Sequence, residues 1–299
     1  MGNMVQYMID YPALYQSADA SSLTGQRRFL NATRVRLAGL VIAAAGGAFT
    51  ASIGAVDVFG VLALVGFAGA IAAEAYILLT KPDRVWYEGR AAAESVKTLA
   101  WRYSVGGEPF PASLNEGVAV DLFLARLGEI LQDLKDLNLT PTLTANVQIT
   151  AEMRRLRIGG FNDRRAAYGS ARIEDQRSWY AAKATWNEVR AQRWSIAVVG
   201  FEIFGLAAGG VKAFTAVDVD LLGLAAAVAA VFTAWRHAKQ YETLNHAYFV
   251  ASQELASIAS QVERHRDDDN WAQFVQEAED AISREHTLWR ASRGVQVRN

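Results

Sequence analysis

LAGLVIAAAGGAFTASIGAV, residues 37–56, carries no charged side chain, and VFGVLALVGFAGAIAAEAYILLT, residues 58–80, carries only Glu74. A helix rises about 1.5 Å per residue and the hydrocarbon layer of a bilayer is about 30 Å thick, so a span needs about 20 apolar residues. Both runs reach that length. Asp57 separates them and is expected at the turn on the far side of the membrane. The two runs therefore predict one transmembrane hairpin.

A second apolar block predicts spans at about 195–217 and 219–236, separated by Asp218 and interrupted in the first half by Glu202 and Lys212. The alternative is a pair of hairpins buried in a soluble protein, but a core with this much Ala and Gly would be too thin to hold one. The whole-chain composition, 52% hydrophobic with a formal net charge of -1, looks like that of an ordinary soluble protein. Averages over the chain therefore do not show the two apolar blocks. The predicted fold class is all-α: an integral membrane protein with four transmembrane helices in two hairpins, extended into a cytosolic helical bundle.

Basic residues gather at one end of every predicted span. In membrane proteins such clusters mark the cytosolic side, so both termini are expected in the cytosol. The first residues lack the pattern of a removable signal peptide, and the chain has no cysteine that could form a disulfide or hold a metal. The basic residues that set this orientation are Arg27, Arg28, Arg34, Arg36, Lys81, Arg84, Arg90, Arg190, Arg193, Arg236 and Lys239.

Each span is expected to continue into an amphipathic stalk that packs on its neighbours. Apolar residues keep alternating spacings of three and four on both sides of the blocks, and the pattern of a shorter helix follows the first stalk. These positions are Val85, Gly89, Ala92, Val96, Leu99 and Tyr103; Phe123, Leu127, Ile130, Leu134 and Leu137; Trp179, Ala182, Trp186 and Val189; and Tyr241, Leu244, Tyr248, Ala251, Leu255, Ile258 and Val262.

The chain divides into two similar modules, residues 1–145 and 146–299, with Pro141 in the linker. The two turns align on a Phe-Thr-Ala and a Val-Asp-Val sequence, and upstream Asn31 and Arg34 align with Asn187 and Arg190. Duplication of one hairpin module would explain these matches. The alternative is that two unrelated hairpins acquired similar turn residues by convergence.

Catalysis has little support in the sequence, so no catalytic residue, metal site or cofactor is expected. The four histidines match neither a metal pair nor a catalytic triad. The segment from Gly205 to Lys212 resembles a phosphate loop only faintly, because Val211 stands where that motif has its lysine. Gly205 and Gly209 are better interpreted as a close-packing seam between helices.

Glu74, Glu202 and Lys212 are the candidate polar residues within the membrane. Glu74 and Glu202 lie about 10–14 Å along the helix from the cytosolic flank, where a carboxylate needs water or a partner. They could line an ion path, or each could make a local hydrogen bond or extend toward the headgroups. Lys212 lies near the outer face and is expected to act as an anchor.

A basic run between the modules is a candidate contact for anions or lipid headgroups. A solvated, salt-bridged helix face is the alternative interpretation. Its members are Arg154, Arg155, Arg157, Arg164 and Arg165, with Arg172 and Arg177 beyond them.

Two polar stretches carry a resemblance to a known family. The first is Arg90-Ala-Ala-Ala-Glu94-Ser-Val-Lys97-Thr-Leu-Ala-Trp101-Arg102-Tyr103, followed by Gly106, Gly107, Pro109 and Phe110. It resembles the bacterial SLATT family of two-span membrane effector domains. The second is Tyr168-x-x-x-Arg172-Ile-Glu-Asp-Gln176-x-x-Trp179-Tyr180-Ala-Ala-Lys183, which is similar to a second SLATT subtype.

The resemblance implies a tandem SLATT protein in a bacterial inner (cytoplasmic) membrane, working in a nucleotide-linked conflict system. The expected function is an oligomeric membrane effector or ion-conducting pore that is not an enzyme and is gated by its cytosolic helices. Its expected partners are the lipid bilayer, further copies of the chain, and a nucleotide second messenger or a separate sensor protein, but no nucleic acid. A non-conducting scaffold that recruits a cytosolic partner, and a constitutive ion channel, remain alternatives.

Overall fold

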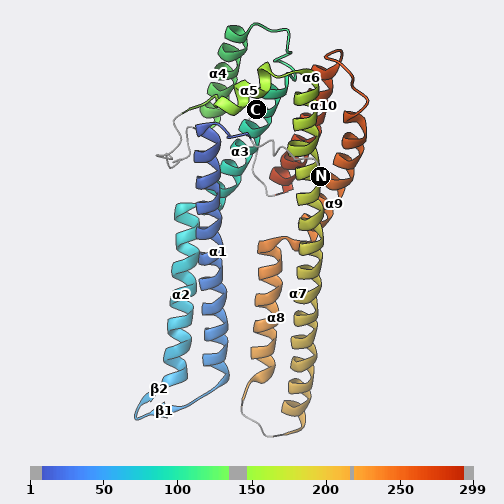
Figure 1. The fold of residues 1–299 in the computed structure, drawn as a ribbon. Coiled ribbons are helices and arrows are strands. Elements are labelled where there is room, and N and C mark those ends of the chain that lie inside the picture. The colour runs from blue at the N-terminus through green and yellow to red at the C-terminus, as the bar shows by residue number, and fades with distance from the viewer. Residues whose placement is uncertain (1–8, 135–146, 216–218, 293–299) are drawn as a thin grey trace, which may run out of the picture. The chain divides into compact units, whose positions relative to one another are not determined.

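The computed structural model describes residues 9–134, 147–215 and 219–292, with side chains described as far as Ser283. Its described residues are almost entirely helical (Figure 1). The helices are α1 (Ala13–Ala48), α2 (Val58–Thr80), α3 (Pro82–Val105), α4 (Glu116–Asp133), α5 (Ala151–Ile158), α6 (Phe161–Ala167), the π-helix η1 (Tyr168–Glu174), α7 (Asp175–Phe214), α8 (Leu221–Lys239), α9 (Tyr241–Val262) and α10 (Trp271–Ser292). Two short antiparallel strands, β1 (Ser52–Ile53) and β2 (Val56–Asp57), join α1 to α2.

The chain forms two compact units, and neither coincides with one half of the sequence. The apolar unit comprises Arg27–Asp83 and Thr185–Asn245, and the polar unit comprises Met1–Gln26, Arg84–Ala184 and His246–Asn299. Both units therefore take residues from both predicted modules.

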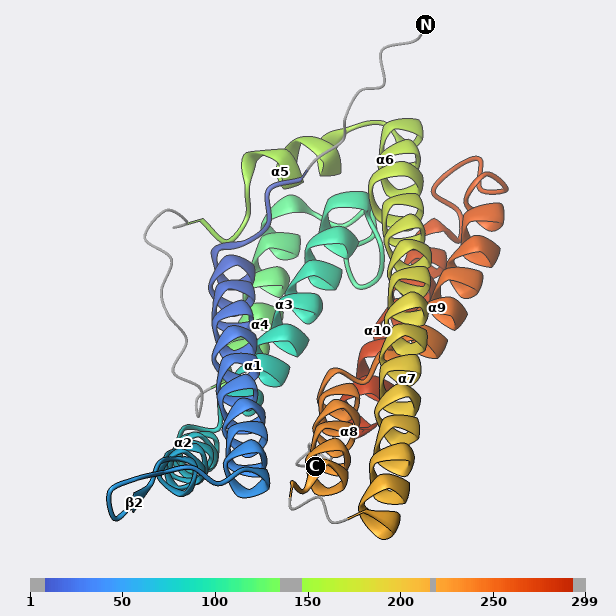
Figure 2. The same cartoon turned by 90° about the horizontal axis from the view of Figure 1, so that it is seen from below.

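In the apolar unit, α1 and α2 lie side by side (Figures 1 and 2) and touch through their backbones. A Cβ atom on Gly39 would lie 2.6 Å from the carbonyl oxygen of Gly66, and one on Gly46 would lie 2.5 Å from that of Phe59. Such close approach is the use that membrane helices make of small residues.

The turn between α1 and α2 is longer than the sequence predicts. The first span was expected to reach Val56, but α1 ends at Ala48. The β1–β2 hairpin then pairs Ser52 with Asp57. The Asp57 carboxylate accepts hydrogen bonds from the backbone N–H of Phe59, at 3.1 Å, and of Ala51, at 3.5 Å, so it closes the turn and caps α2.

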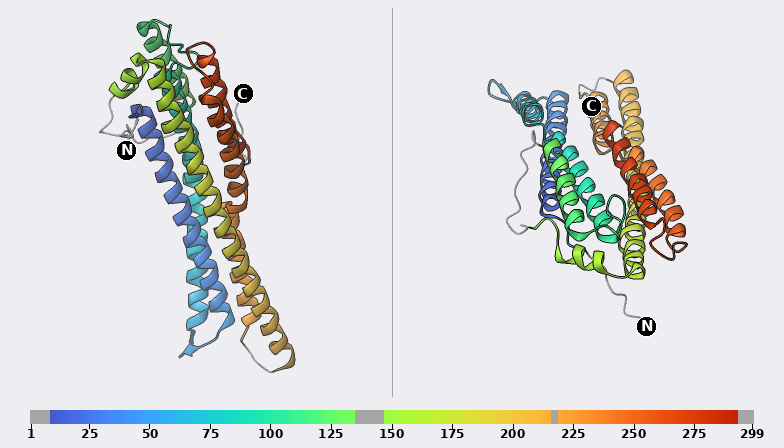
Figure 3. Two further views of the ribbon diagram at one scale, coloured as in Figure 1. Left: turned by 45° about the vertical axis from the view of Figure 1, so that its right-hand side comes forward. Right: turned by 90° about the horizontal axis from the view of Figure 1, so that it is seen from above.

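The second pair, α7 and α8, also lies side by side (Figures 1 and 3). A Cβ atom on Gly205 would lie 3.2 Å from the Cβ of Ala225, and one on Gly209 would lie 3.4 Å from a methyl carbon of Leu222. The predicted seam of Gly205 and Gly209 thus faces α8, with looser contacts than those between α1 and α2. Asp218, the predicted turn residue, lies outside the described residues.

Both hairpins end in the same local structure. Lys81 after α2 and Gln240 after α8 adopt the left-handed conformation, with φ of 43° and 52°. The backbone N–H of Lys81 bonds to the carbonyl of Ile77 at 2.9 Å, and that of Gln240 bonds to the carbonyl of Arg236 at 2.8 Å. The stalks α3 and α9 are therefore separate helices, whereas the sequence predicts continuous ones.

The polar unit has a large aromatic core. Its fully buried side chains include Trp101, Tyr103, Phe123, Tyr168 and Trp271. The predicted apolar faces of α3, α4 and α9 are buried or half-buried, as expected for stalks that pack on their neighbours. Leu137 and Pro141 lie outside the described residues.

The predicted packing face of α7 packs on α9 but stays partly exposed, with ring centres of Trp179 and Tyr248 5.4 Å apart and those of Trp186 and Tyr241 5.9 Å apart. Trp179, Trp186 and Val189 are exposed, whereas the neighbouring face with Tyr180 and Ala184 is buried. The tryptophans have other partners, since the charged groups of Lys183 and Arg190 lie over their rings, at 5.7 Å from Trp179 and 4.9 Å from Trp186. A Trp ring can pack on a neighbouring helix with one part and bind a cation at the surface with the rest. The periodic pattern therefore does not show that these side chains stay partly exposed.

Candidate functional site

Glu74, the first of the two predicted intramembrane carboxylates, has a partner on the neighbouring helix. Its Oε2 accepts a hydrogen bond from a terminal guanidinium nitrogen of Arg36 in α1, and the two side chains form an ion pair. The pair joins α1 to α2 near the basic end of the hairpin. A carboxylate paired in this way avoids most of the cost that an isolated charge has in hydrocarbon.

Glu202 has a different environment. It is exposed on α7, and within the described part of the chain it makes no hydrogen bond or ion pair. Val199 and Leu206, a turn before and a turn after it on the helix, are 51% and 78% exposed. The carboxylate therefore stands on an apolar surface of the protomer. A charged side chain near the middle of a span costs about 2.5–3.5 kcal/mol, so this surface is unfavourable in contact with lipid.

Lys212 lies near the far end of α7 and bonds to the opposite side of the turn. Its Nζ is 2.8 Å from Oδ1 of Asp220. Asp220 also caps α8, since its carboxylate accepts a hydrogen bond from the backbone N–H of Gly223 at 3.4 Å. This ion pair joins the ends of α7 and α8, so Lys212 has a partner within the protein.

The predicted basic cluster divides into buried and exposed members. Arg157 is buried and donates to the carbonyl oxygens of Tyr103, Phe110, Pro111 and Leu114, at 2.9–3.4 Å. Those bonds stabilise the loop after α3. The Arg157 guanidinium therefore binds groups of the protein itself and is not the predicted contact for an anion or a lipid headgroup.

Two further members also have partners in the protein. Arg164 pairs with Asp268 at 2.5 Å, and Arg165 donates to the carbonyl oxygen of His265 at 2.6 Å. Arg154 and Arg155 are exposed on α5 and remain available for an anion.

A buried ion pair lies at the centre of the polar unit. Arg172, on η1, and Glu279, on α10, are 1% and 0% exposed. The guanidinium donates two hydrogen bonds to the carboxylate, at 2.9 Å and 2.7 Å, and the hydroxyl of Tyr168 donates a third at 3.1 Å. The π-helix places Tyr168 and Arg172 on the same inward face, and such helices are frequent at functional positions.

The ion pair is connected to α3 on its other side. The hydroxyl of Thr98 donates to Glu279 at 2.8 Å. Its neighbour Lys97 donates to the amide oxygen of Gln176 at 3.2 Å. The two sequence stretches that carry the family resemblance therefore meet in one network. Periodicity does not predict this contact, because neither stretch shows which buried polar residue faces the other.

Burial changes the acid–base behaviour of this network. Burial raises the pKa of Tyr168 well above its ordinary value, and the charge of Glu279 raises it further. Burial lowers the pKa of Lys97, as does the charge of Arg172. For Arg172 burial acts to lower the pKa, but the charge of Glu279 and its hydrogen bonds outweigh that effect and raise it. Arg172 therefore stays charged at neutral pH.

Metal-binding geometry is absent from the described residues, which include no group of three or more acidic or histidine side chains able to hold an ion. Polar side chains in this part of the chain instead form the buried network around Arg172 and Glu279 and ion pairs such as that of Lys212 with Asp220.

Together these observations define a class of protein. The described part of the chain has four helical segments long and apolar enough to cross a membrane: α1 (Ala13–Ala48), α2 (Val58–Thr80), the run of α6, η1 and α7 (Phe161–Phe214), and the run of α8 and α9 (Leu221–Val262). The protein is thus a multi-pass membrane protein.

Its family follows from two domain matches. Residues 12–165 match the SMODS and SLOG-associating 2TM effector domain 3, and residues 168–289 match the corresponding domain 1. The chain belongs to the SLATT family and carries two SLATT domains in tandem, as the resemblance implied. The two matched segments adjoin between residues 165 and 168. No curated protein and no solved structure matches the chain.

Proposed function

We propose that the protein is a homo-oligomeric membrane effector whose spans form an ion-conducting path, gated by the helices of the polar unit. The single observation that carries this proposal is the position of Glu202. It is a carboxylate on the exposed apolar surface of α7, with no partner among the described residues. Facing another copy or a hydrated path removes the cost of holding this charge against lipid.

One protomer is too small to conduct alone. Its predicted spans are rich in Ala and Gly and pack as thin pairs, with backbones in contact at Gly39 and Gly66. Helices that approach so closely leave no room for a hydrated channel between them. Several copies arranged around an axis, with Glu202 of each facing inward, would supply both the room and the polar lining.

The remaining features of the proposal follow from the domains and the charges. The polar unit lies in the cytosol, with both termini, because basic residues flank the spans on that side. The membrane is the bacterial inner membrane. The domain descriptions associate such modules with SMODS and SLOG proteins, so the trigger is a nucleotide second messenger or a separate sensor protein. No catalytic step by this chain is required.

The pair of Arg36 and Glu74 supports the second candidate, a non-conducting scaffold that recruits a cytosolic partner. One of the two carboxylates expected to line a path already has a local partner. If Glu202 is likewise satisfied by a neighbouring helix, the spans serve only as an anchor.

The test is ion flux into vesicles reconstituted with the full-length protein, together with toxicity on expression. Glu202→Gln removes the charge and keeps the shape, and Glu188→Gln on the exposed polar stretch of α7 is the matched control. The proposal expects flux and toxicity to fall in the first variant and to persist in the control. Wild-type protein that carries no flux, with toxicity that persists in Glu202→Gln and is lost on truncating the polar helices, would support the scaffold instead.

A further inference from the structure

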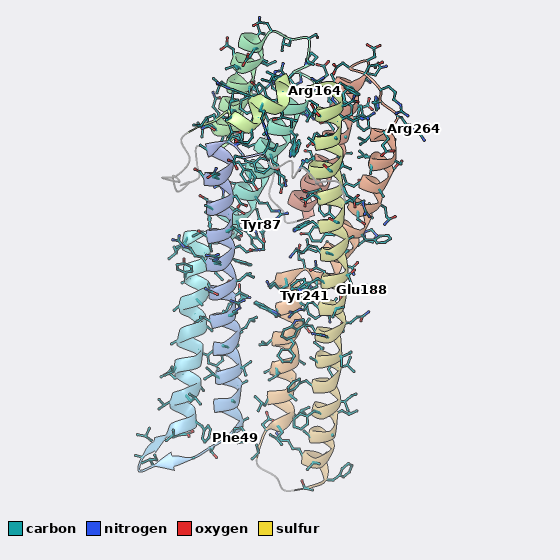
Figure 4. The ribbon with its side chains drawn as sticks, viewed as in Figure 1. Phe49, Tyr87, Arg164, Glu188, Tyr241 and Arg264 are labelled. Atoms are coloured by element: carbon teal, nitrogen blue, oxygen red, sulfur yellow. The ribbon has the colours of Figure 1, made fainter. Side chains whose placement is uncertain are left out.

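Three basic side chains from separate helices converge in the apolar unit, at the end of the spans where the basic residues lie. Arg34 on α1 and Lys239 on α8 both lie over the ring of Trp235, each 5.5 Å from its centre. Arg190 on α7 lies over Trp186, which packs on Tyr241 with ring centres 5.9 Å apart. Tyr241 is labelled in Figure 4, where the chain passes from α8 to α9.

The charges of this cluster are not balanced by acids. Burial lowers the pKa of Lys239, and the charges of Arg34 and Arg190 lower it further. Within the described residues, no carboxylate contributes to that shift. Two acids lie near the cluster along the chain: Glu242 pairs with Arg236, and Glu188, two residues before Arg190, forms no ion pair within the described residues.

The charges of Arg34 and Arg190 also affect the pKa of the neighbouring Tyr241 hydroxyl. Burial raises the pKa of Tyr241, whereas the charges of Arg190 and Arg34 and the hydrogen bonds from the indoles of Trp235 and Trp194 lower it. Since those indole N–H groups already bond to Tyr241, the donors left for a phosphate are the guanidinium and ammonium groups of Arg34, Arg190 and Lys239, which bind phosphate oxygens strongly.

The position of the two arginines gives a second, independent observation. Arg34 follows Asn31 by three residues, and Arg190 follows Asn187 by three residues, as aligned positions of the two modules. Asn31 accepts a hydrogen bond from Arg34 at 2.7 Å. Arg34 and Arg190 thus both lie close to Lys239, where a bound anion would relieve the repulsion between the three positive charges.

We infer that Arg34, Arg190 and Lys239 form a binding site for the phosphate of an anionic phospholipid headgroup, framed by Trp235 and Trp186. Arg34, Arg190 and Lys239 lie within the helices long enough to cross the bilayer, just beyond the cytosolic ends of their predicted apolar runs, where headgroup phosphates are expected. The ring faces of the two tryptophans position the cations, and both arginines are exposed, so the site is open to a headgroup. The inference depends on membrane insertion and not on conduction.

The experiment uses the full-length protein reconstituted in phosphatidylcholine vesicles containing a minor fraction of phosphatidylglycerol. After gentle detergent extraction, native mass spectrometry counts the phosphatidylglycerol that remains bound. The test variant combines Arg34→Gln, Arg190→Gln and Lys239→Gln. The matched control combines Arg27→Gln, Arg28→Gln and Arg193→Gln, which removes the same charge at exposed basic residues outside the cluster. A third variant, with Arg34→Lys, Arg190→Lys and Lys239→Arg, keeps the charge and shows whether loss of binding reflects misfolding.

The wild type, the control and the charge-keeping variant are expected to retain phosphatidylglycerol. The test variant is expected to retain at least roughly tenfold less phosphatidylglycerol, since basic residues near the membrane surface attract anionic headgroups. Equal retention by the test variant, or equal loss by the control, would overturn the site. Displacement of the lipid by soluble inorganic phosphate would also overturn it, because the site would then be one for a free anion.

Discussion

Thr98 of α3 donates a hydrogen bond of 2.8 Å to Glu279 of α10, although 181 residues separate them. The two residues belong to different SLATT domains. Around this bond α10 makes further contacts with the first domain. The indole N–H of Trp271 donates to the carbonyl oxygen of Val105 at 2.8 Å, and the N–H of Glu108 bonds to the carbonyl of Ala272 at 2.9 Å. The second domain therefore completes the core of the first.

We expect Glu279→Gln to destabilise the protein by about 3–5 kcal/mol, because it leaves the buried charge of Arg172 without its partner. Glu277→Gln, two residues earlier at an exposed position on the same helix, is the control and should change stability by less than about 0.5 kcal/mol. Chemical unfolding of the two variants in mild detergent measures both values. Equal stability of the two variants would show that the ion pair does not hold the unit together.

We expect the two SLATT domains to fold only together. Expressed alone, residues 1–166 lack Trp271 and Glu279, and they expose the core surface that α10 covers. Each half should therefore aggregate or be degraded when produced singly, while co-expression should yield a complex that co-purifies. A first half that is stable and monodisperse by itself would contradict this expectation.

We expect Gly39→Ala to weaken the α1–α2 pair by about 1–3 kcal/mol, because the new methyl carbon would lie 2.6 Å from a backbone oxygen. Gly69→Ala is the matched control on α2, since a Cβ there meets nothing within 4 Å. Unfolding by sodium dodecyl sulfate in mixed micelles compares the two variants. A cost for Gly69→Ala as large as that for Gly39→Ala would mean that helix packing is not responsible.

We expect the polar unit to lose stability as the pH rises above about 10. The pKa values of Tyr11, Tyr15 and Tyr168 are all raised, mainly by burial. A group whose folded pKa is raised stabilises the fold fully below its unfolded pKa, and this contribution is lost as the pH rises through the folded value. Tyr168→Phe should make the alkaline loss less steep while lowering stability at neutral pH, where its bond to Glu279 is missing. Unfolding curves measured across the alkaline range test both effects.

Apolar run lengths predict the spans, and alternating spacings predict the buried faces of α3, α4 and α9, because both properties depend on local chain geometry. They do not predict the turn at residues 52–57, where the Asp57 carboxylate and a short β-hairpin end α1 early. Nor do they distinguish Glu74 from Glu202. The two look equivalent by depth along the helix, but Arg36 on a neighbouring helix gives one of them a partner.

The most direct test of the central claim is disulfide cross-linking between copies at Leu206→Cys, one turn beyond Glu202 on the exposed surface of α7. The chain contains no cysteine, so each engineered thiol is unique. Val65→Cys on α2, 61% exposed, is the matched control for random collisions in the membrane. We expect mild oxidation in native membranes to cross-link Leu206→Cys into dimers well above the level of the control. Equal, low cross-linking of both variants would contradict an oligomer built on the α7 surface and would leave Glu202 without the role proposed for it.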